Sequence, residues 1–242
     1  MKGDSPTPID ENIRKKFLII YLLIIVLSFV PCSLFEYLYF IAFWKEGTYW
    51  IFFLFAPLNT LLLIYILQFS AILFSTLFLA IIKLIYAPKE GIFKRDVKNN
   101  DYFYWNLRNI VKKWALYVAA SNPFPWFKNR FTLRFFGVKI GKNVICDNSW
   151  ISSEFVSIGD NVIIGMGSTL LTFGIEQDKF VLKKIIIEDD VVIGAKCVLL
   201  PGTTIKKAAK LSAHSYTNMD DILKGNSIYM GHPAKLREEM NN

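Results

Sequence analysis

The sequence predicts an α + β protein in which an apolar helical hairpin and an amphipathic connector precede a solenoid of short parallel strands. Three observations predict this architecture. Two apolar runs in the first third of the chain are each long enough to cross a bilayer. A mixed aromatic and basic segment follows them. Aliphatic residues then recur at every sixth position through the C-terminal part of the chain.

The composition excludes several classes of protein and of site. The 242 residues are 53% hydrophobic and 16% aromatic, which is incompatible with a mainly disordered or collagen-like chain. The three cysteines, Cys32, Cys146 and Cys197, are odd in number and widely spaced, so they predict no disulfide framework. The only two histidines are His214 and His232, which excludes a three-histidine metal site, and we predict no metal.

The two apolar runs predict a transmembrane helical hairpin over residues 17–86. The run Phe17–Trp44 contains one charged residue, Glu36, and the run Tyr49–Ile82 contains none. A signal peptide has a shorter apolar region followed by a small-residue cleavage site, which this sequence lacks. Glu36 lies about 29 Å along a helix that starts at the beginning of the first run, and this length places it near the far membrane interface.

The flanks of these runs predict the topology. Pro57 is expected to divide the second run and to leave Thr60–Ile82 as its crossing; a further crossing in the divided run, for three in all, is the alternative. Basic residues stay on the cytoplasmic side of a membrane. Here they precede the first run and follow the second, as Arg14, Lys15, Lys16, Lys83, Lys89, Lys94, Arg95 and Lys98. We therefore expect an integral membrane protein with two transmembrane helices, in which the tail 1–16 and the C-terminus are both cytoplasmic.

Residues 87–135 predict an amphipathic connector on the membrane surface. Apolar and basic residues alternate at helical spacing, as Phe103, Leu107, Arg108, Ile110, Lys112, Lys113, Trp114 and Tyr117. Pro123 and Pro125 are expected to end this helix. The net charge of +8 fits either nucleic acid or anionic lipid. The adjacent hairpin favours the lipid bilayer as partner and argues against nucleic acid.

Residues 136–240 contain the repeats. Two series of residues are spaced by six: Ile140, Cys146, Ser152, Ile158, Ile164 and Leu170, then Ile187, Ile193, Leu199, Ile205 and Leu211. Three such units close a triangular coil, and the repeated aliphatic side chains fill its interior. Cys146 and Cys197 are expected to be small interior fillers. The spacing breaks at residues 171–186, where the polar segment Thr172–Lys179 predicts a loop that leaves the coil on the binding face.

The repeats resemble a known family. The segments Ile158–Gly165 and Ile193–Gly202, with the closing motif Gly231–Lys235, resemble the hexapeptide-repeat acyltransferases, whose fold is a left-handed parallel β-helix. The order of membrane segment, aromatic–basic connector and the segment Arg134–Gly141 resembles the membrane-bound terminal region of poly-lysine synthetase-type enzymes. The resemblance implies a homotrimer that binds acetyl-CoA or acyl-CoA along the coil edge between subunits.

The same resemblance implies a reaction and its site. The expected reaction is acyl transfer to a hydroxyl or amine of a glycan, lipid-linked or amino-acid acceptor at the cytoplasmic membrane face. The expected cofactor-binding residues are Gly194, Ala195, Ala213 and Lys235, and the expected substrate-binding residue is Thr172.

The catalytic base of the family departs from its usual form here. Family members use a loop histidine, which abstracts a proton near neutral pH. This chain has Phe173 or Ile175 at the aligned position and no histidine before His214. Glu176 is the predicted catalytic residue in the loop, and Asp178 is a second loop carboxylate. His214 as a relocated base is the alternative.

A second class of function is therefore kept open. The chain could be a catalytically inactive trimeric membrane scaffold, or a partner subunit, that keeps the fold but lacks the loop histidine. A pore formed by three hairpins is a third hypothesis, which rests on Glu36 alone.

Overall fold

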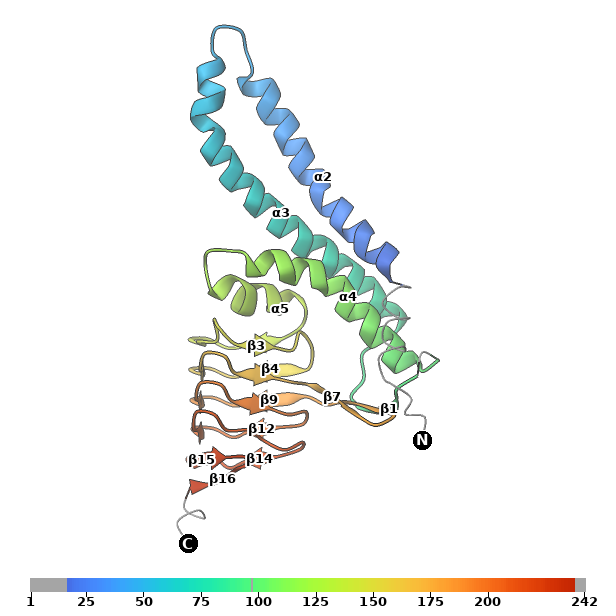
Figure 1. Ribbon diagram of the computed structural model, residues 1–242, viewed down its shortest axis with the longest axis vertical. Helices are drawn as coiled ribbons and strands as arrows, with labels where there is room; N and C mark the ends of the chain where they lie inside the picture. The colour runs from blue at the N-terminus through green and yellow to red at the C-terminus, as the bar shows by residue number, and fades with distance from the viewer. Residues whose placement is uncertain (1–16, 97, 238–242) are drawn as a thin grey trace. The chain divides into compact units, whose positions relative to one another are not determined.

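The computed structural model describes residues 17–96 and 98–237, and its contacts divide the chain into two compact units (Figure 1). The first comprises Met1–Tyr86 and Asn106–Ser121, and the second comprises Ala87–Trp105 and Asn122–Asn242. The division predicted from the sequence, into 17–86, 87–135 and 136–240, differs from this grouping by contacts and stays a prediction.

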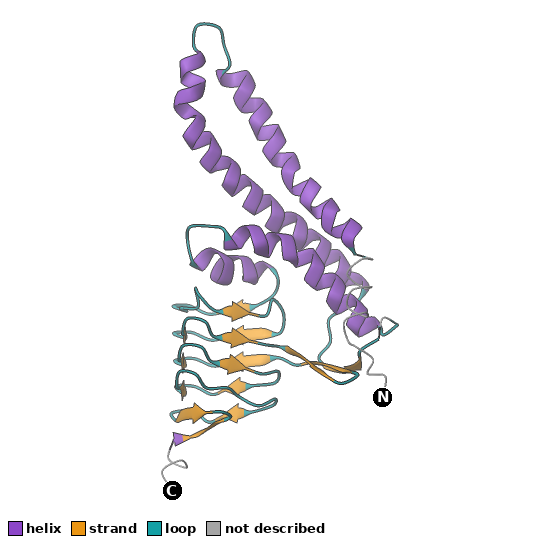
Figure 2. Cartoon of the chain, in the orientation of Figure 1, coloured by secondary structure: helices purple, strands orange, loops and turns teal. Residues whose placement is uncertain are grey.

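Two long helices make the hairpin of the first unit (Figure 2). They are α2 (Leu18–Phe43) and α3 (Tyr49–Ile85), and both are long and apolar enough to cross a membrane. The expected division at Pro57 is wrong, because α3 continues through this residue as α2 does through Pro31. A proline removes one backbone hydrogen bond, but an apolar environment offers the remaining backbone groups no partner better than the helix itself.

Polar side chains join the two helices. Ser70 Oγ on α3 donates a hydrogen bond to the Ser28 carbonyl on α2 at 2.7 Å, and both serines are buried. Near the turn of the hairpin, Tyr39 Oη donates to the Phe52 carbonyl at 2.6 Å. These bonds satisfy carbonyl groups that an apolar surrounding would leave without a second partner.

Helix α4 (Asn100–Ala120) forms where the sequence predicts an amphipathic helix, but it buries a different face. The buried residues of its second half are Leu107, Arg108, Val111, Lys112, Ala115, Val118 and Ala119. The predicted exposed basic face is wrong at Arg108 and Lys112, whose side chains are 1% and 0% exposed, whereas Tyr117 is 70% exposed. The alanines of the buried set explain the difference, because small side chains permit the closest packing and leave the large rings outside.

Three parallel sheets form most of the second unit (Figure 1). The first contains β2 (Lys139–Ile140), β4 (Val156–Ile158), β9 (Ile185–Ile187), β12 (Thr204–Ile205) and β14 (Ile222–Leu223). The second contains β5 (Ile163–Ile164), β10 (Val192–Ile193), β13 (Lys210–Leu211) and β15 (Ile228–Gly231), with β16 (Ala234–Leu236) added antiparallel. The third contains β3 (Trp150–Ile151), β6 (Thr169–Leu170) and β11 (Val198–Leu199).

The strand register agrees with the predicted six-residue repeat. Thr204 pairs with Ile186 and with Ile222, each 18 residues away, so one coil consists of three repeat units and gives one strand to each sheet. The repeated aliphatic side chains, from Ile158 to Leu211, are at most 3% exposed and form a continuous interior. Cys146 and Cys197 are 0% exposed, as expected for interior fillers.

One member of the predicted series is displaced by one position. The residue opposite Leu170 is Ile151, and not Ser152. The first coil therefore has one extra residue before Ile158. An aliphatic side chain fills the interior better than a hydroxyl does, and Ser152 Oγ instead accepts a hydrogen bond from the Thr172 backbone N–H at 3.1 Å.

A short helical segment covers the first coil. It consists of the π-helix η1 (Phe127–Thr132) and the single turn α5 (Leu133–Phe135). The fully buried Asn129 donates through Nδ2 to the carbonyls of Cys146 and Ser149, at 2.6 and 2.8 Å. These carbonyls have no preceding coil to pair with, so the asparagine side chain takes the place of a coil at the end of the solenoid.

The segment that interrupts the repeats is a β-hairpin. As predicted, residues 172–179 leave the coil, and Ile158 pairs with Ile187, 29 residues away. The segment is not an irregular loop, however: β7 (Phe173–Glu176) pairs with β8 (Lys179–Leu182), which pairs with β1 (Gly91–Lys94), all antiparallel. The ring of Phe180, 0% exposed, lies 4.5 Å from that of Trp105 at the start of α4, so aromatic packing stabilises this small sheet.

Candidate functional site

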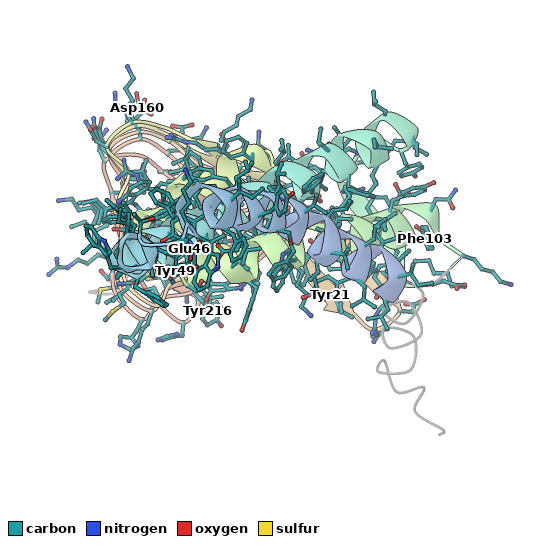
Figure 3. All side chains as sticks on the ribbon, turned by 90° about the horizontal axis from the view of Figure 1, so that it is seen from above. Tyr21, Glu46, Tyr49, Phe103, Asp160 and Tyr216 are labelled. Carbon is teal, nitrogen blue, oxygen red and sulfur yellow. The ribbon has the colours of Figure 1, made fainter. Side chains whose placement is uncertain are left out.

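The turns between strands form three columns along the solenoid, one at each corner of the coil. Corner A contains the turns that follow the first sheet, at residues 159–162, 188–191 and 206–209. Corner B contains the turns that follow the second sheet, at 165–168, 194–197 and 212–215. Corner C contains the turns that follow the third sheet, at 200–203 and 218–221, and also the hairpin. Seen along the coils, Asp160 of corner A and Tyr216, between corners B and C, lie on different sides (Figure 3).

Small residues bring successive turns of corner B into close contact. A Cβ atom on Gly165 would lie 2.4 Å from the backbone nitrogen of Ala195, and one on Gly194 would lie 2.4 Å from that of Ala213. No side chain fits in either place, so glycine is required by close approach and not by its backbone angles. The predicted cofactor residues Gly194, Ala195 and Ala213 are therefore neighbours in adjacent coils.

Corner B differs from corner A in its backbone donors. At corner A the N–H groups of Lys142, Asp160 and Lys207 donate to carboxylates of adjacent coils, namely to Asp160 at 2.7 Å, Asp189 at 2.8 Å and Glu188 at 2.9 Å. Within the described residues, no acceptor is found for the N–H groups of Ala195 and Ala213. Two turns one coil apart, about 4.8 Å, thus each offer an unused donor at a place without large side chains.

The charges of corner A are used within the corner. Lys206 Nζ donates to Glu188 Oε1 at 2.8 Å. This bond and the bond from the Lys207 N–H hold the pKa of Glu188 below its ordinary value. Lys207 also lies 3.6 Å from Asp190. The carboxylates of this corner cap the solenoid turns and satisfy one another's neighbours, and they are not free for catalysis.

Lys235 lies on the sheet whose turns form corner B. Strand β16 pairs with β15, with Lys235 opposite Met230, and β15 pairs with β13. The Lys235 side chain is exposed at the end of this sheet. All four predicted cofactor residues therefore lie on one sheet or in its turns.

His214 is part of corner B as well. Its backbone φ is +58°, the left-handed conformation that Lys196 and Gly167 adopt at the same place in earlier turns. Its N–H donates to the Ala195 carbonyl at 2.9 Å, and its side chain is exposed. The histidine thus occupies a regular turn position next to Ala213.

The structure does not bring Glu176 and Thr172 to corner B. Glu176 is exposed at the end of β7, opposite Lys179. Thr172 is 1% exposed at the base of the hairpin. A Cβ on Gly174 would lie 2.9 Å from Met219 Cε, which places the hairpin base against corner C. Within one chain the predicted base and the predicted cofactor residues therefore lie at different corners.

Sequence reasoning missed a group of aromatic rings at the base of the hairpin. The Phe173 ring lies 5.0 Å from that of Trp105 and 6.4 Å from that of Trp150, which is 45% exposed. These residues come from three distant parts of the chain, and no local pattern announces that they meet. Their partly exposed faces lie beside Thr172.

The cysteines offer no nucleophile. Burial raises the pKa of the Cys146 thiol to about 11 and also raises that of Cys197, whose Sγ donates to the Ser212 carbonyl at 3.1 Å. A thiol with a raised pKa is not a thiolate near neutral pH. Among the residues that the structure describes, no three His, Cys, Asp or Glu side chains gather into a possible metal site.

Comparisons with known proteins agree with the repeats and with this site. Residues 184–216 match the family model described as the hexapeptide repeat of succinyl-transferase. The chain is 29% identical over 139 residues to the putative acetyltransferase YvoF of Bacillus subtilis, which covers 54% of this chain and 80% of that protein. The matched repeat segment contains Gly194, Ala195 and Ala213.

Two solved structures are also similar to the chain. One is a hexapeptide-repeat acetyltransferase of Vibrio cholerae in complex with acetyl coenzyme A, at 28% identity and a TM-score of 0.39 over 41% of this chain and 58% of that one. The other is a galactoside acetyltransferase in complex with coenzyme A, at 20% identity and a TM-score of 0.40 over 50% and 74%. Together, the family model and the curated relative support a place among the hexapeptide-repeat acetyltransferases.

Proposed function

We propose that this chain is an acyl-CoA-dependent acyltransferase anchored in a membrane by α2 and α3. Its solenoid is then a left-handed parallel β-helix, as the resemblance to the family implies. The observation that carries the proposal is corner B, where Gly194 leaves space beside the unused N–H donors of Ala195 and Ala213. This corner lies in the segment that matches the hexapeptide family model.

The geometry of corner B suits the pantetheine arm of coenzyme A. That arm is a narrow chain with two amide groups, and their carbonyls can accept hydrogen bonds from the Ala195 and Ala213 N–H groups. The small side chains let it lie close to the backbone. Lys235, on the same sheet, supplies a positive charge for the phosphates of the coenzyme, which lysine binds as a point charge.

A complete site would need a second copy of the chain. Because Glu176 lies at corner C and the cofactor residues at corner B, the hairpin of one copy has to reach corner B of the next, as a homotrimer would allow. Glu176 would take the proton of an acceptor hydroxyl or amine. The acceptor oxygen or nitrogen then attacks the thioester carbonyl, and coenzyme A leaves as a thiol after it takes up that proton.

The acceptor would lie beside the hairpin. A glycan, lipid-linked or amino-acid acceptor is the class that the family resemblance implies. The partly exposed rings of Trp150 and Phe173 offer a flat apolar surface for the non-reacting part of such an acceptor. Among the three classes these rings favour the glycan, because the apolar face of a sugar ring stacks on aromatic side chains.

Filling corner B is expected to weaken coenzyme binding. We expect Ala213→Leu to raise the dissociation constant for acetyl-CoA about tenfold or more, because the larger side chain covers the two N–H donors. The Ala213 side chain is exposed, so the solenoid interior is not disturbed. Isothermal titration of the detergent-solubilised chain measures the constant.

The matched control for this experiment is Asn218→Leu, which places the same side chain at an exposed position of corner C. The control variant should bind acetyl-CoA as the unchanged chain does. Equal weakening in both variants, or none in Ala213→Leu, would show that the coenzyme does not bind at corner B.

The membrane part of the proposal has its own test. In sealed inside-out vesicles, protease should digest the solenoid, whereas in intact cells protease added outside should leave it uncut. The reason is that both chain ends are predicted to stay on the side of the basic flanks. Cleavage of the solenoid in intact cells would contradict this topology and favour three crossings.

The alternative is a scaffold or partner subunit that keeps the fold without catalysis. It is favoured by one observation, the absence of histidine from the hairpin, where Phe173 takes part in aromatic packing instead. A chain that binds acetyl-CoA but transfers no acyl group to any glycan or lipid extract would support this alternative.

A further inference from the structure

An apolar groove lies between the two long helices of the first unit. It has a volume of about 700 Å³, and its lining includes Phe29, Glu36 and Phe40 of α2 and Leu63, Ile64 and Leu67 of α3. This volume is in the range of small-molecule sites. All of these residues except Glu36 are apolar.

The polar atoms at this groove are acceptors without enough donors. Asn59 Nδ2 donates a hydrogen bond of 2.8 Å to Glu36 Oε2 across the two helices. Asn59 is only 7% exposed, and its Oδ1 has no hydrogen-bond partner among the described residues. A carboxylate and an amide carbonyl thus meet in an apolar surrounding, where each is costly without a donor. A ligand with several N–H donors and a positive charge satisfies both groups.

The position along the helices gives the groove its orientation. Aromatic rings gather at the turn of the hairpin, where Trp44 stacks on Phe40 and lies 4.8 Å from Tyr49. Such a belt marks a membrane–water interface. Glu36 lies one helical turn inside the belt.

The length of the groove matches one leaflet. From Phe40 to Phe29 the helix rises about 16 Å, which is close to half of a hydrocarbon core of about 30 Å. The groove therefore runs from the interface at the hairpin turn to about the middle of the bilayer, with its polar pair at the interface end.

We propose that this groove binds one lipid with a primary ammonium headgroup, from the leaflet that contains the turn between α2 and α3. The ammonium group donates hydrogen bonds to Glu36 and to Asn59 Oδ1, and one acyl chain lies along Phe29, Leu63 and Leu67. The proposal rests on the membrane insertion in the proposed function and is independent of acyl transfer.

The test compares lipids that differ in hydrogen-bond donors. The full chain is placed in nanodiscs of phosphatidylcholine mixed with either phosphatidylethanolamine or phosphatidylglycerol, and retained lipids are counted by native mass spectrometry. Phosphatidylethanolamine has three N–H donors, whereas the quaternary ammonium of phosphatidylcholine has none. We expect phosphatidylethanolamine to be retained about tenfold or more over both other lipids, because a charge-assisted hydrogen bond is lost with each of them.

Three variants assign the effect to the groove. Glu36→Gln and Asn59→Leu should each reduce this preference about tenfold. Glu46→Gln, the same change at an exposed carboxylate in the hairpin turn, should leave it intact. Equal retention of the three lipids, or a preference that survives Glu36→Gln, would overturn the proposal. A change of oligomeric state in Glu36→Gln without a change in lipid retention would overturn it too, because it would identify a second copy of the chain as the occupant.

Carbonate extraction separates this proposal from the membrane proposal. A chain that alkaline carbonate releases from membranes is not inserted, and this result would overturn both. A chain that stays in the membrane but shows no lipid preference would overturn the lipid site alone and leave the proposed function standing.

Discussion

Replacing Glu176 by glutamine is expected to lower the turnover number for acyl transfer about a hundredfold or more. The change keeps the size and hydrogen-bonding capacity of the side chain but removes the group that accepts a proton. General-base catalysis contributes a factor of this order. The residue is exposed at the end of β7, so the substitution is not expected to disturb folding. Steady-state kinetics with an acceptor from a glycan or lipid extract measure the effect.

Two further variants test the assignment of the base. Asp178→Asn makes the same chemical change two residues away in the exposed turn of the hairpin and should leave turnover within a few-fold. His214→Ala tests the other candidate base, next to Ala213 at corner B. If His214→Ala abolishes transfer and Glu176→Gln does not, the base has moved to corner B and our assignment is wrong.

Replacing Gly194 by alanine is expected to destabilise the solenoid strongly. The added Cβ would lie 2.4 Å from the Ala213 nitrogen and 2.7 Å from its Cα, and these backbone atoms cannot move without shifting the next coil. Overpacking of this kind costs about 3 kcal/mol. For a unit of this size we expect the thermal midpoint to fall by about 6–12 °C, as measured by circular dichroism in detergent.

Gly174→Ala is the matched control for this substitution. Its Cβ would lie 2.9 Å from Met219 Cε, the end of a flexible side chain that can turn away. The midpoint should therefore change by less than about 3 °C. A similar loss in both variants would show that the close contact at corner B is not what makes Gly194 necessary.

The repeats could be predicted from the sequence because they are a local pattern. Each aliphatic residue of the series faces the interior of its own coil, so spacing alone identifies the core. The pattern failed at Ser152, where the interior takes Ile151 one position earlier. A strict period cannot show such a slip, because it depends on which of two neighbouring side chains fills the space better.

The errors outside the repeats have a different physical cause. In α4 the large rings predict one buried face, but packing selects the face with Ala115 and Ala119, because backbone approach matters more than ring size there. The partner of Glu36 could not be predicted either. Asn59 lies 23 residues away on another helix, and only the antiparallel pairing of the two helices brings it within 2.8 Å.

The candidate site was predictable in part for the same reason. Gly194, Ala195 and Ala213 lie one coil apart, so the repeat itself brings them together. The sheet of the hairpin was not predictable, because its third strand, β1, precedes the repeats by a long interval.

The pairing of β1 with β8 has a consequence for synthesis of the chain. Lys94 pairs with Lys179, 85 residues further along. At the usual rate of translation, an interval of this length takes roughly 4–17 s. Throughout that time β1 has left the ribosome with an unpaired edge, directly after the second apolar helix. An edge strand that waits invites pairing with the wrong chain, so the nascent protein is most prone to aggregate in this interval. Slowing translation between β1 and β8 should therefore lower the yield of folded protein more than an equal delay after β8.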